Sequence, residues 1–157
     1  MAKVFIELGE ILENNPRFID TRFDLGEKSA GRQMYNKGHI EGAVYWDLEE
    51  DLSDMGSQDG RHPMISKEKM TRLVQQAGLK LDDYIVIYDQ GATPFALRAY
   101  FLLEWAGFKH IHVSRSGYEE LKGKLPVSNM ESVLPHTSTI PEWNNDKLLT
   151  MAEVRKV

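Results

Sequence analysis

The chain has 157 residues, of which 41% are hydrophobic and 27% charged, values typical of one folded globular domain and not of a disordered chain. Its formal net charge of −5 disfavours nucleic acid as a partner, because binding to phosphates requires a basic face. It has no cysteine, which excludes disulfides and any thiol nucleophile within the chain, and no run near the ~20 apolar residues that cross a bilayer.

Helices and strands alternate along the first 127 residues. Apolar residues at helical spacing predict helices over residues 4–14 and 66–77. The most apolar strand, residues 84–88, is expected at the centre of the sheet. The other predicted strands are 17–21, 43–46 and 110–113, and the other predicted helices are 33–35, 95–106 and 117–122. This alternation predicts an α/β domain with a central parallel sheet flanked by helices.

The character of the chain changes after Val127. Residues 128–147 are polar, contain two prolines and show no periodicity, so we expect a linker. Residues 148–157 then start a new helix, in which Thr150 and Glu153 have the spacing of a capping box. This helix stops after about two turns, which is shorter than an isolated helix can sustain. We therefore expect it to be the start of a second, truncated domain.

The loop after the central strand is the expected place for a site, because open α/β sheets bind ligands at the carboxyl ends of their strands. Its N–H groups, next to a helix N-terminus, suit an anion or a reactive side chain. Asp89 stands where a nucleophile would be placed. A carboxylate there can instead accept the N–H bonds of the loop and cap the next helix, and we favour this structural role. The loop consists of Asp89, Gln90, Gly91, Ala92, Thr93 and Pro94.

Several motifs, taken with their spacing, resemble those of rhodanese domains. They are Asp20-Thr21-Arg22, Gly38-His39-Ile40-Glu41-Gly42-Ala43, Gly60-Arg61-His62-Pro63, Ile87-Tyr88-Asp89, Ala96-Leu97-Arg98-Ala99 and Leu102-Leu103-Glu104-Trp105-Ala106-Gly107. The resemblance covers about residues 4–127. There the chain looks like the amino-terminal half of the two-domain thiosulfate and 3-mercaptopyruvate sulfurtransferases.

The resemblance implies a division of labour between two rhodanese domains. In that family the carboxy-terminal domain has the cysteine that accepts sulfur, and the amino-terminal domain commonly has an aspartate at the equivalent position, here Asp89. A second rhodanese domain is then the implied partner, and a small anionic sulfur donor the implied substrate. One motif departs from the family: a Leu-Asp-Gly-Gly turn is usual after the last strand, whereas this chain has residues 114–121 with only Gly117 retained.

Two arginines and one histidine are the remaining candidates. Arg22 and Arg61 suit contact with the other domain or with an anionic substrate, although local ion pairs account for them equally well. His39, with Asp20 as an orienting partner, resembles a general base. However, the family places this histidine in a turn that defines the fold, together with Asp20 and Gly42. We therefore favour the structural role and predict no catalytic residue in this chain.

No metal site or cofactor is predicted. The acidic residues between Asp47 and Asp59 lack the ligand spacing of a calcium loop, so a solvated loop is expected. His110 and His112 share one side of a strand, but the sequence shows no third ligand beside them.

Two hypotheses about function remain open. In the first, the chain is the non-catalytic domain of a sulfurtransferase that moves sulfane sulfur from thiosulfate or 3-mercaptopyruvate to cyanide or a thiol. In the second, it is a stand-alone rhodanese-fold module that binds an anion or regulates a partner without chemistry. In both we expect a cytoplasmic protein, since the amino terminus meets Glu7 too early for a secretory apolar core.

Overall fold

Strands and helices alternate along the chain in the computed structural model, which describes residues 5–14, 16–23, 27, 29–47, 67–91, 95–130 and 136–143. The strands are β1 (Phe5–Ile6), β2 (Arg17–Asp20), β3 (His39–Ile40), β4 (Val44–Tyr45), β5 (Tyr84–Tyr88), β6 (His110–Ser114) and β7 (Val127–Ser128). The helices are α1 (Leu8–Asn14), α2 (Ala30–Lys37), α3 (Lys67–Gln76), α4 (Phe95–Trp105) and α5 (Tyr118–Leu121).

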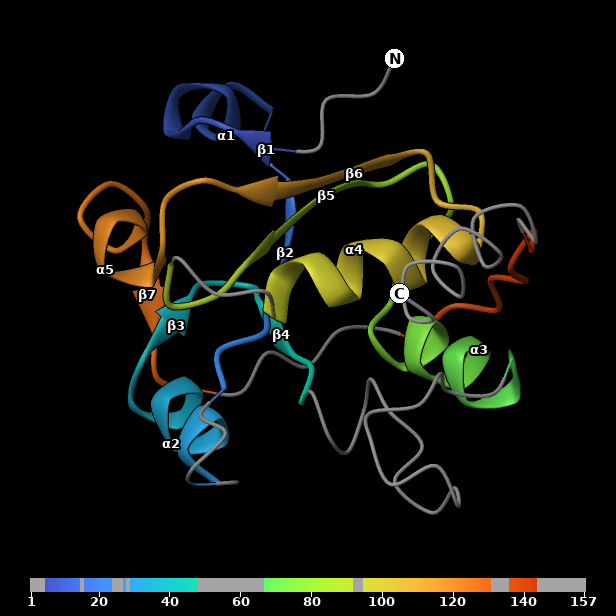
Figure 1. Cartoon of the computed structure of the whole chain (residues 1–157), viewed down its shortest axis with the longest axis horizontal. Helices are drawn as coiled ribbons and strands as arrows, with labels where there is room; N and C mark the ends of the chain where they lie inside the picture. Colours follow the sequence, from blue (N-terminus) through green and yellow to red (C-terminus); the bar gives the residue numbers. More distant parts are fainter. Residues whose placement is uncertain are drawn as a thin grey trace, which may run out of the picture.

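A five-stranded parallel sheet forms the centre of the molecule, in the order β1-β6-β5-β2-β4 (Figure 1). The register aligns Ile87 of β5 with Ile19 of β2 on one side and with Val113 of β6 on the other. The predicted central position of residues 84–88 is therefore confirmed, as is the parallel sheet with helices around it. Parallel strands have their carboxyl ends at the same edge, so the segments that follow β2 and β5 lie side by side.

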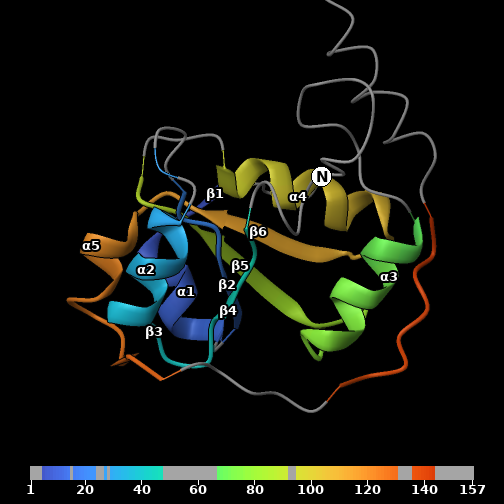
Figure 2. The ribbon, with the colours of Figure 1, turned by 90° about the horizontal axis from the view of Figure 1, so that it is seen from below.

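The two faces of the sheet bury different helices, because successive side chains of a strand point to opposite faces. On one face, Ile85 and Ile87 of β5 pack with α3 and α4 in one apolar cluster. On the other, Val86 and Tyr88 pack with α1 and α5 in a second cluster. Figure 2 shows α3 and α4 well separated from α1 and α5.

The helix α4, which packs against β5, is deeply buried. Seven of its eleven residues are buried, as its nearly continuous apolar sequence predicts: Phe95, Ala96, Ala99, Tyr100, Leu102, Leu103 and Trp105. The helix ends at Trp105, and Gly107 shortly after it has a φ of +98° that only glycine adopts without strain. At its other end, the first residue of the helix, Phe95, directly follows the loop after β5.

The prediction for residues 4–14 was wrong in its first part. Phe5 and Ile6 form an edge strand, paired in parallel with Val113 and Ser114, and the helix begins only at Leu8. Strand pairing buries the Ile6 side chain almost completely, and this tertiary contact overrides the helical spacing of the segment. Leu12, expected on the buried helix face, is half exposed.

Residues after Val127 contribute contacts to the domain. β7 pairs antiparallel with β3 and aligns Val127 with Ile40. Residues 136–143 have no regular secondary structure but bind along α3, as described below. The division into a domain at 4–127 and a linker at 128–147 stays a prediction, and the proposed second domain at 148–157 lies outside the described residues.

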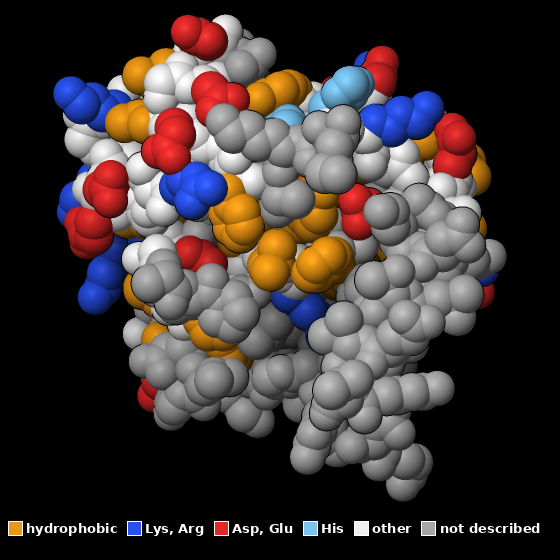
Figure 3. Space-filling model, turned by 45° about the horizontal axis from the view of Figure 1, so that its top comes forward, with side chains coloured by type: hydrophobic (Ala, Val, Ile, Leu, Met, Phe, Trp, Pro, Cys, Tyr) orange, Lys and Arg blue, Asp and Glu red, His pale blue; other side chains and the backbone are white. Residues whose placement is uncertain are grey.

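The surface mixes both signs of charge. On the face drawn in Figure 3, acidic and basic side chains are interspersed around a central group of hydrophobic ones. Among the described residues, no helix combines the length and apolarity needed to cross a membrane. The absence of a nucleic-acid partner and the cytoplasmic location stay predictions.

Candidate functional site

The loop that follows β5 occupies the carboxyl edge of the sheet, beside the segment that follows β2. Thr21 ties the two ends together, because its N–H and its hydroxyl both donate to the carbonyl of Tyr88, at 2.9 and 3.0 Å. Asp89, Gln90 and Gly91 come next and are described. The remaining residues of the predicted loop, Ala92, Thr93 and Pro94, lie outside the described residues.

The Asp89 carboxylate turns inward and accepts hydrogen bonds from the backbone around it. Oδ1 accepts from the N–H of Gly91 at 2.8 Å, and Oδ2 accepts from the N–H of Ala96 at 3.1 Å. Ala96 is the second residue of α4, whose first N–H groups have no partner within the helix. These two hydrogen bonds make Asp89, which is only 6% exposed, a cap of the helix. The structural role favoured from the sequence predicted this cap.

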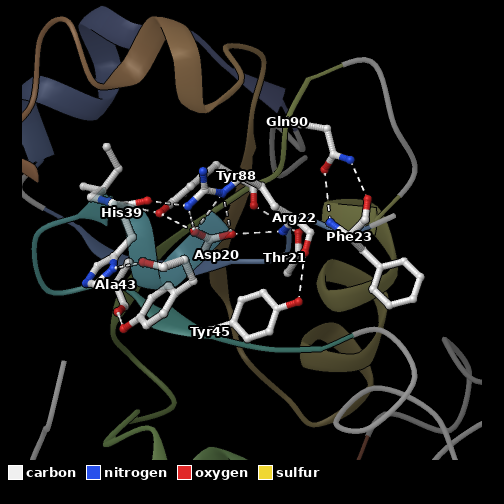
Figure 4. Close-up of polar contacts among 12 residues, drawn as sticks. Asp20, Thr21, Arg22, Phe23, His39, Ala43, Tyr45, Tyr88 and Gln90 are labelled. Atoms are coloured by element: carbon white, nitrogen blue, oxygen red, sulfur yellow. Dashed lines mark hydrogen bonds and ion pairs between the residues drawn. The ribbon is translucent and has the colours of Figure 1, made fainter. Parts of the chain in front are cut away.

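Gln90 holds the loop against the segment that follows β2. Its Nε2 donates to the carbonyl of Phe23 at 2.5 Å, and its Oε1 accepts from the N–H of Phe23 at 3.3 Å (Figure 4). The Phe23 ring packs edge-on against Phe95, the first residue of α4, with centroids 5.5 Å apart. The Gln90 side chain therefore joins the loop to the segment after β2, and the Phe23 ring of that segment contacts the helix α4.

The turn that follows β6 supports the same loop from behind. Tyr118 donates its N–H to the carbonyl of Asp89 at 3.0 Å. A Cβ atom on Gly117 would lie 2.6 Å from the carbonyl oxygen of Gln90 and 2.8 Å from the nitrogen of Gly91, closer than real Cβ contacts. This close approach explains why glycine is retained at 117 although the rest of the family turn is altered.

A buried ion pair lies under this edge of the sheet. Arg22 donates from Nη2 to Oδ2 of Asp20 at 2.7 Å and from Nε to both carboxylate oxygens (Figure 4). Its Nη2 also donates to the carbonyl of Gly38 at 2.7 Å, and its guanidinium lies 3.9 Å from the centre of the Tyr118 ring. Burial alone lowers the pKa of Arg22, but the hydrogen bond and charge of Asp20 outweigh it and raise the pKa.

Tyr88 completes this network from the end of β5. Its hydroxyl donates to Oδ2 of Asp20 at 2.9 Å and accepts from the N–H of Ile40 at 3.1 Å. Burial, and then the negative charge of Asp20, raise the pKa of Tyr88 far above its usual range, so the hydroxyl stays protonated. Tyr88 is not among the candidate residues predicted from the sequence, although a tyrosine that ends a buried strand has a hydroxyl that needs a partner.

Of the two arginines predicted from the sequence, the structure describes Arg22. Arg22 is 4% exposed and directs its donors to Asp20 and Gly38, which is the local ion pair that the sequence left open as one alternative. Arg61 lies outside the described residues, so its predicted contact with a substrate or a second domain stays a prediction.

His39 is fully buried and has a structural position. Its Nδ1 lies 2.8 Å from the carbonyl of Tyr35, which can only accept, so Nδ1 bears the proton. Its ring stacks on that of Tyr35 at 3.7 Å. Asp20, the orienting partner suggested by the sequence, is bonded instead to Arg22 and Tyr88. The histidine thus joins the end of α2 to the strand β3.

Gly42 forms the turn that follows His39. Ala43 donates its N–H to the carbonyl of Ile40 at 2.9 Å, and Gly42 has a φ of +87°. These are the features of a type II turn, whose third residue needs the positive φ that glycine accepts. The fold-defining role that the resemblance implies for His39 and Gly42 stays a prediction.

The two strand histidines and the acidic residues from Asp47 to Asp59 were weighed in the sequence as possible metal ligands. His110 is exposed, whereas His112 is partly buried with its ring 4.7 Å from that of Tyr84. Within the described part of the chain, no group of three or more potential metal ligands comes together. Of the acidic residues between Asp47 and Asp59, only Asp47 is described.

Comparison with known proteins matches the chain to one family. A family model described as a rhodanese-like domain matches residues 6–124. A probable 3-mercaptopyruvate sulfurtransferase of Pseudomonas aeruginosa is 41% identical over 120 residues, which are 74% of this chain and 42% of that protein. The chain therefore spans less than half the length of this relative.

Solved structures share the fold at lower identity. SseA from Escherichia coli, a 3-mercaptopyruvate sulfotransferase, has a TM-score of 0.80 and 24% identity, covering 98% of this chain and 63% of that one. The 3-mercaptopyruvate sulfurtransferase from Leishmania major has a TM-score of 0.78 and 24% identity, covering 90% of this chain and 40% of that one. At this identity the likeness concerns the fold alone.

Proposed function

The chain belongs to the rhodanese-like domain family, and on this premise we propose that it is the non-catalytic domain of a sulfurtransferase. The complete protein would move sulfane sulfur from thiosulfate or 3-mercaptopyruvate to cyanide or a thiol acceptor. The name of the Pseudomonas aeruginosa relative supports this class of reaction.

The observation that carries the proposal is the carboxylate of Asp89 in the loop after β5. Sulfane sulfur is held on a protein as a persulfide, which forms when a cysteine thiolate attacks the donor sulfur and the rest of the donor leaves. Asp89 has no sulfur atom, and both of its oxygens accept hydrogen bonds from the backbone. The whole chain has no cysteine. The loop is thus built around a cap where a nucleophile would be needed.

The same carboxylate disfavours the alternative function as an anion-binding module. The N–H groups of Gly91 and Ala96 would be the donors for a bound anion, but Asp89 already occupies both. Its negative charge would also repel an anion that approached these N–H groups. We therefore propose that the donor binds mainly to a second rhodanese domain that supplies the cysteine. A reducing compartment such as the cytoplasm would keep that cysteine as a thiol.

The test is a sulfur-transfer assay on two proteins. The 157-residue chain and a longer product of the same gene that includes a cysteine-containing domain are each supplied with thiosulfate or 3-mercaptopyruvate and with cyanide. We expect thiocyanate from the longer product only, and the loss of that activity when its loop cysteine is changed to serine. Turnover by the 157-residue chain above a no-protein control would contradict the proposal.

A further inference from the structure

Residues 136–143, within the segment predicted as a linker, run along α3 and reach the end of α4 (Figures 1 and 2). The first half of this segment binds the turn after α3. Thr137 donates its N–H to the carbonyl of Gln75 at 3.0 Å and its hydroxyl to the carbonyl of Leu79, also at 3.0 Å. The hydroxyl of Thr139 donates to the same Leu79 carbonyl at 2.6 Å, and Gln75 Nε2 donates back to the carbonyl of Thr139 at 2.9 Å.

The second half binds the end of α4. Glu142 donates its N–H to the carbonyl of Ala106 at 2.9 Å. The neighbouring Gly107 leaves room for this approach, because a Cβ atom there would collide with the Glu142 backbone. Trp143 packs its ring 4.5 Å from that of the buried Trp105, at an interplanar angle of 47°. Pro141, which precedes Glu142 in sequence, is buried.

Most of these hydrogen bonds run from the segment to carbonyls at or just after the carboxyl ends of α3 and α4. The last carbonyls of a helix have no N–H partner within the helix and must find donors elsewhere. Gln75 lies in the last turn of α3, and Ala106 directly follows α4. The segment therefore supplies donors to the carboxyl ends of two helices that form one side of the apolar core. Without this segment, the Ala106 carbonyl would lose its donor from Glu142, and Trp105 would lose its contact with Trp143.

We propose that residues 136–143 are a strap that belongs to this domain, and that it fixes the chain at Trp143. The boundary of the domain then moves from Val127 to Trp143. A consequence rests on the proposed function: if a second domain begins at 148, four residues separate it from the strap, and an extended chain of that length spans at most about 18 Å. The second domain is then held close to the ends of α3 and α4.

Amide hydrogen exchange tests the strap in the 157-residue chain. We expect the N–H groups of Thr137 and Glu142 to exchange at least about 100-fold more slowly than in an unstructured peptide. Changing both threonines (Thr137→Val and Thr139→Val) keeps the shape of the side chains but removes their hydroxyl donors. The double variant should therefore exchange the backbone N–H at position 137 faster and have a lower Tm. The control, Thr71→Val, removes an exposed hydroxyl that bonds within α3 and should leave the Thr137 exchange unchanged.

The outcomes separate the strap from the proposed function. Exchange of Thr137 and Glu142 at peptide rates, or equal effects of the double variant and the control on Thr137 exchange, would overturn the strap. A longer product with slow exchange at both positions but without sulfur transfer would overturn the proposed function and leave the strap intact. In an active longer product, we expect insertion of ten Gly and Ser residues after Trp143 to enlarge the radius of gyration measured by X-ray scattering; an unchanged radius would overturn the inference that the short connection from the strap holds the second domain close.

Discussion

The carboxylate of Asp89 accepts a hydrogen bond from the N–H of Ala96 at 3.1 Å, across the loop that joins β5 to α4. One residue at the end of the central strand thereby caps the helix packed behind that strand. The cap accounts for both the burial of a charged side chain and the absence of free donors at Gly91 and Ala96.

Loss of this cap should destabilise the domain. We expect Asp89→Ala to reduce the free energy of unfolding by about 1–2 kcal/mol, because it removes a helix cap and leaves the buried N–H of Ala96 and the partly buried N–H of Gly91 without this acceptor. Asp89→Asn keeps one carbonyl acceptor and should cost less. Urea denaturation measures both, with the exposed Asp82→Ala as a control. Equal stability of Asp89→Ala and the control would contradict the role of Asp89 as a cap.

A thiol placed at the same position should be acidic. In Asp89→Cys the N–H groups of Gly91 and Ala96 would face a sulfur atom at a helix N-terminus, which favours the thiolate and lowers the pKa below the usual value of about 8.5. Absorbance of the thiolate at 240 nm (roughly its maximum) during a pH titration measures this pKa. Ser138→Cys, at an exposed position, is the control. If both thiols titrate together, the loop provides no anion-stabilising environment.

The Tyr88 hydroxyl should contribute more to the free energy of unfolding than the Tyr100 hydroxyl does. Tyr88→Phe leaves the buried N–H of Ile40 without an acceptor and removes a donor from Asp20, so we expect a loss of about 1–3 kcal/mol in unfolding free energy. The control is Tyr100→Phe, whose hydroxyl makes one partly buried hydrogen bond to Glu104. A larger loss in the control than in Tyr88→Phe would show that the buried network adds little.

Stability should fall in strong alkali. Burial, followed by the charge of Glu104, raises the pKa of Tyr100 to about 12, and the pKa of Tyr88 is raised as well. The folded state thus holds these protons more tightly than the unfolded state, whose tyrosines titrate near about 10. This contribution is fully present below pH ~10 and is lost as pH rises through the folded-state value of about 12. Unfolding free energies across this range should fall less steeply for Tyr100→Phe than for the unchanged protein.

Two glycines should respond to alanine with opposite signs. Gly117→Ala places a Cβ atom against the backbone of Gln90 and Gly91, so the loop must shift, at a cost of about 1–3 kcal/mol. Gly9, within α1, has no atom within 4 Å of the added Cβ, and Gly9→Ala should stabilise by about 0.5–1 kcal/mol. Thermal unfolding of both variants measures the difference, and a stabilised Gly117→Ala would disprove the close contact between the two loops.

Local chemistry in the sequence was sufficient for several features. The apolar run 84–88 predicted the central strand, and the all-round apolar helix 95–106 predicted deep burial, because hydrophobic patterning decides which elements are buried. The absence of cysteine and the presence of Asp89 after the central strand are properties of the sequence alone. Capping by Asp89 was also predictable, since aspartate before a helix commonly accepts N–H bonds.

Long-range contacts decided the rest. Phe5 and Ile6 lie in a segment predicted as a helix but pair with β6, more than 100 residues away in the chain, and no local signal reveals that partner. The ion pair of Asp20 with Arg22 was one of two open alternatives until Tyr88 and Gly38 were seen beside it. The polar residues 136–143 have the composition of a linker, yet hydrogen bonds to the carbonyls of Gln75, Leu79 and Ala106 hold them in place.

The sequence by itself determined that this chain has no thiol and that Asp89 stands at the end of its central strand. Only the tertiary structure decided how this strand end is held, because Thr21 and Phe23, which bind Tyr88 and Gln90, lie more than 60 residues away in the chain. Composition thus limits which chemistry is possible, whereas the pairing of distant strands holds the loop in which Asp89 caps the helix.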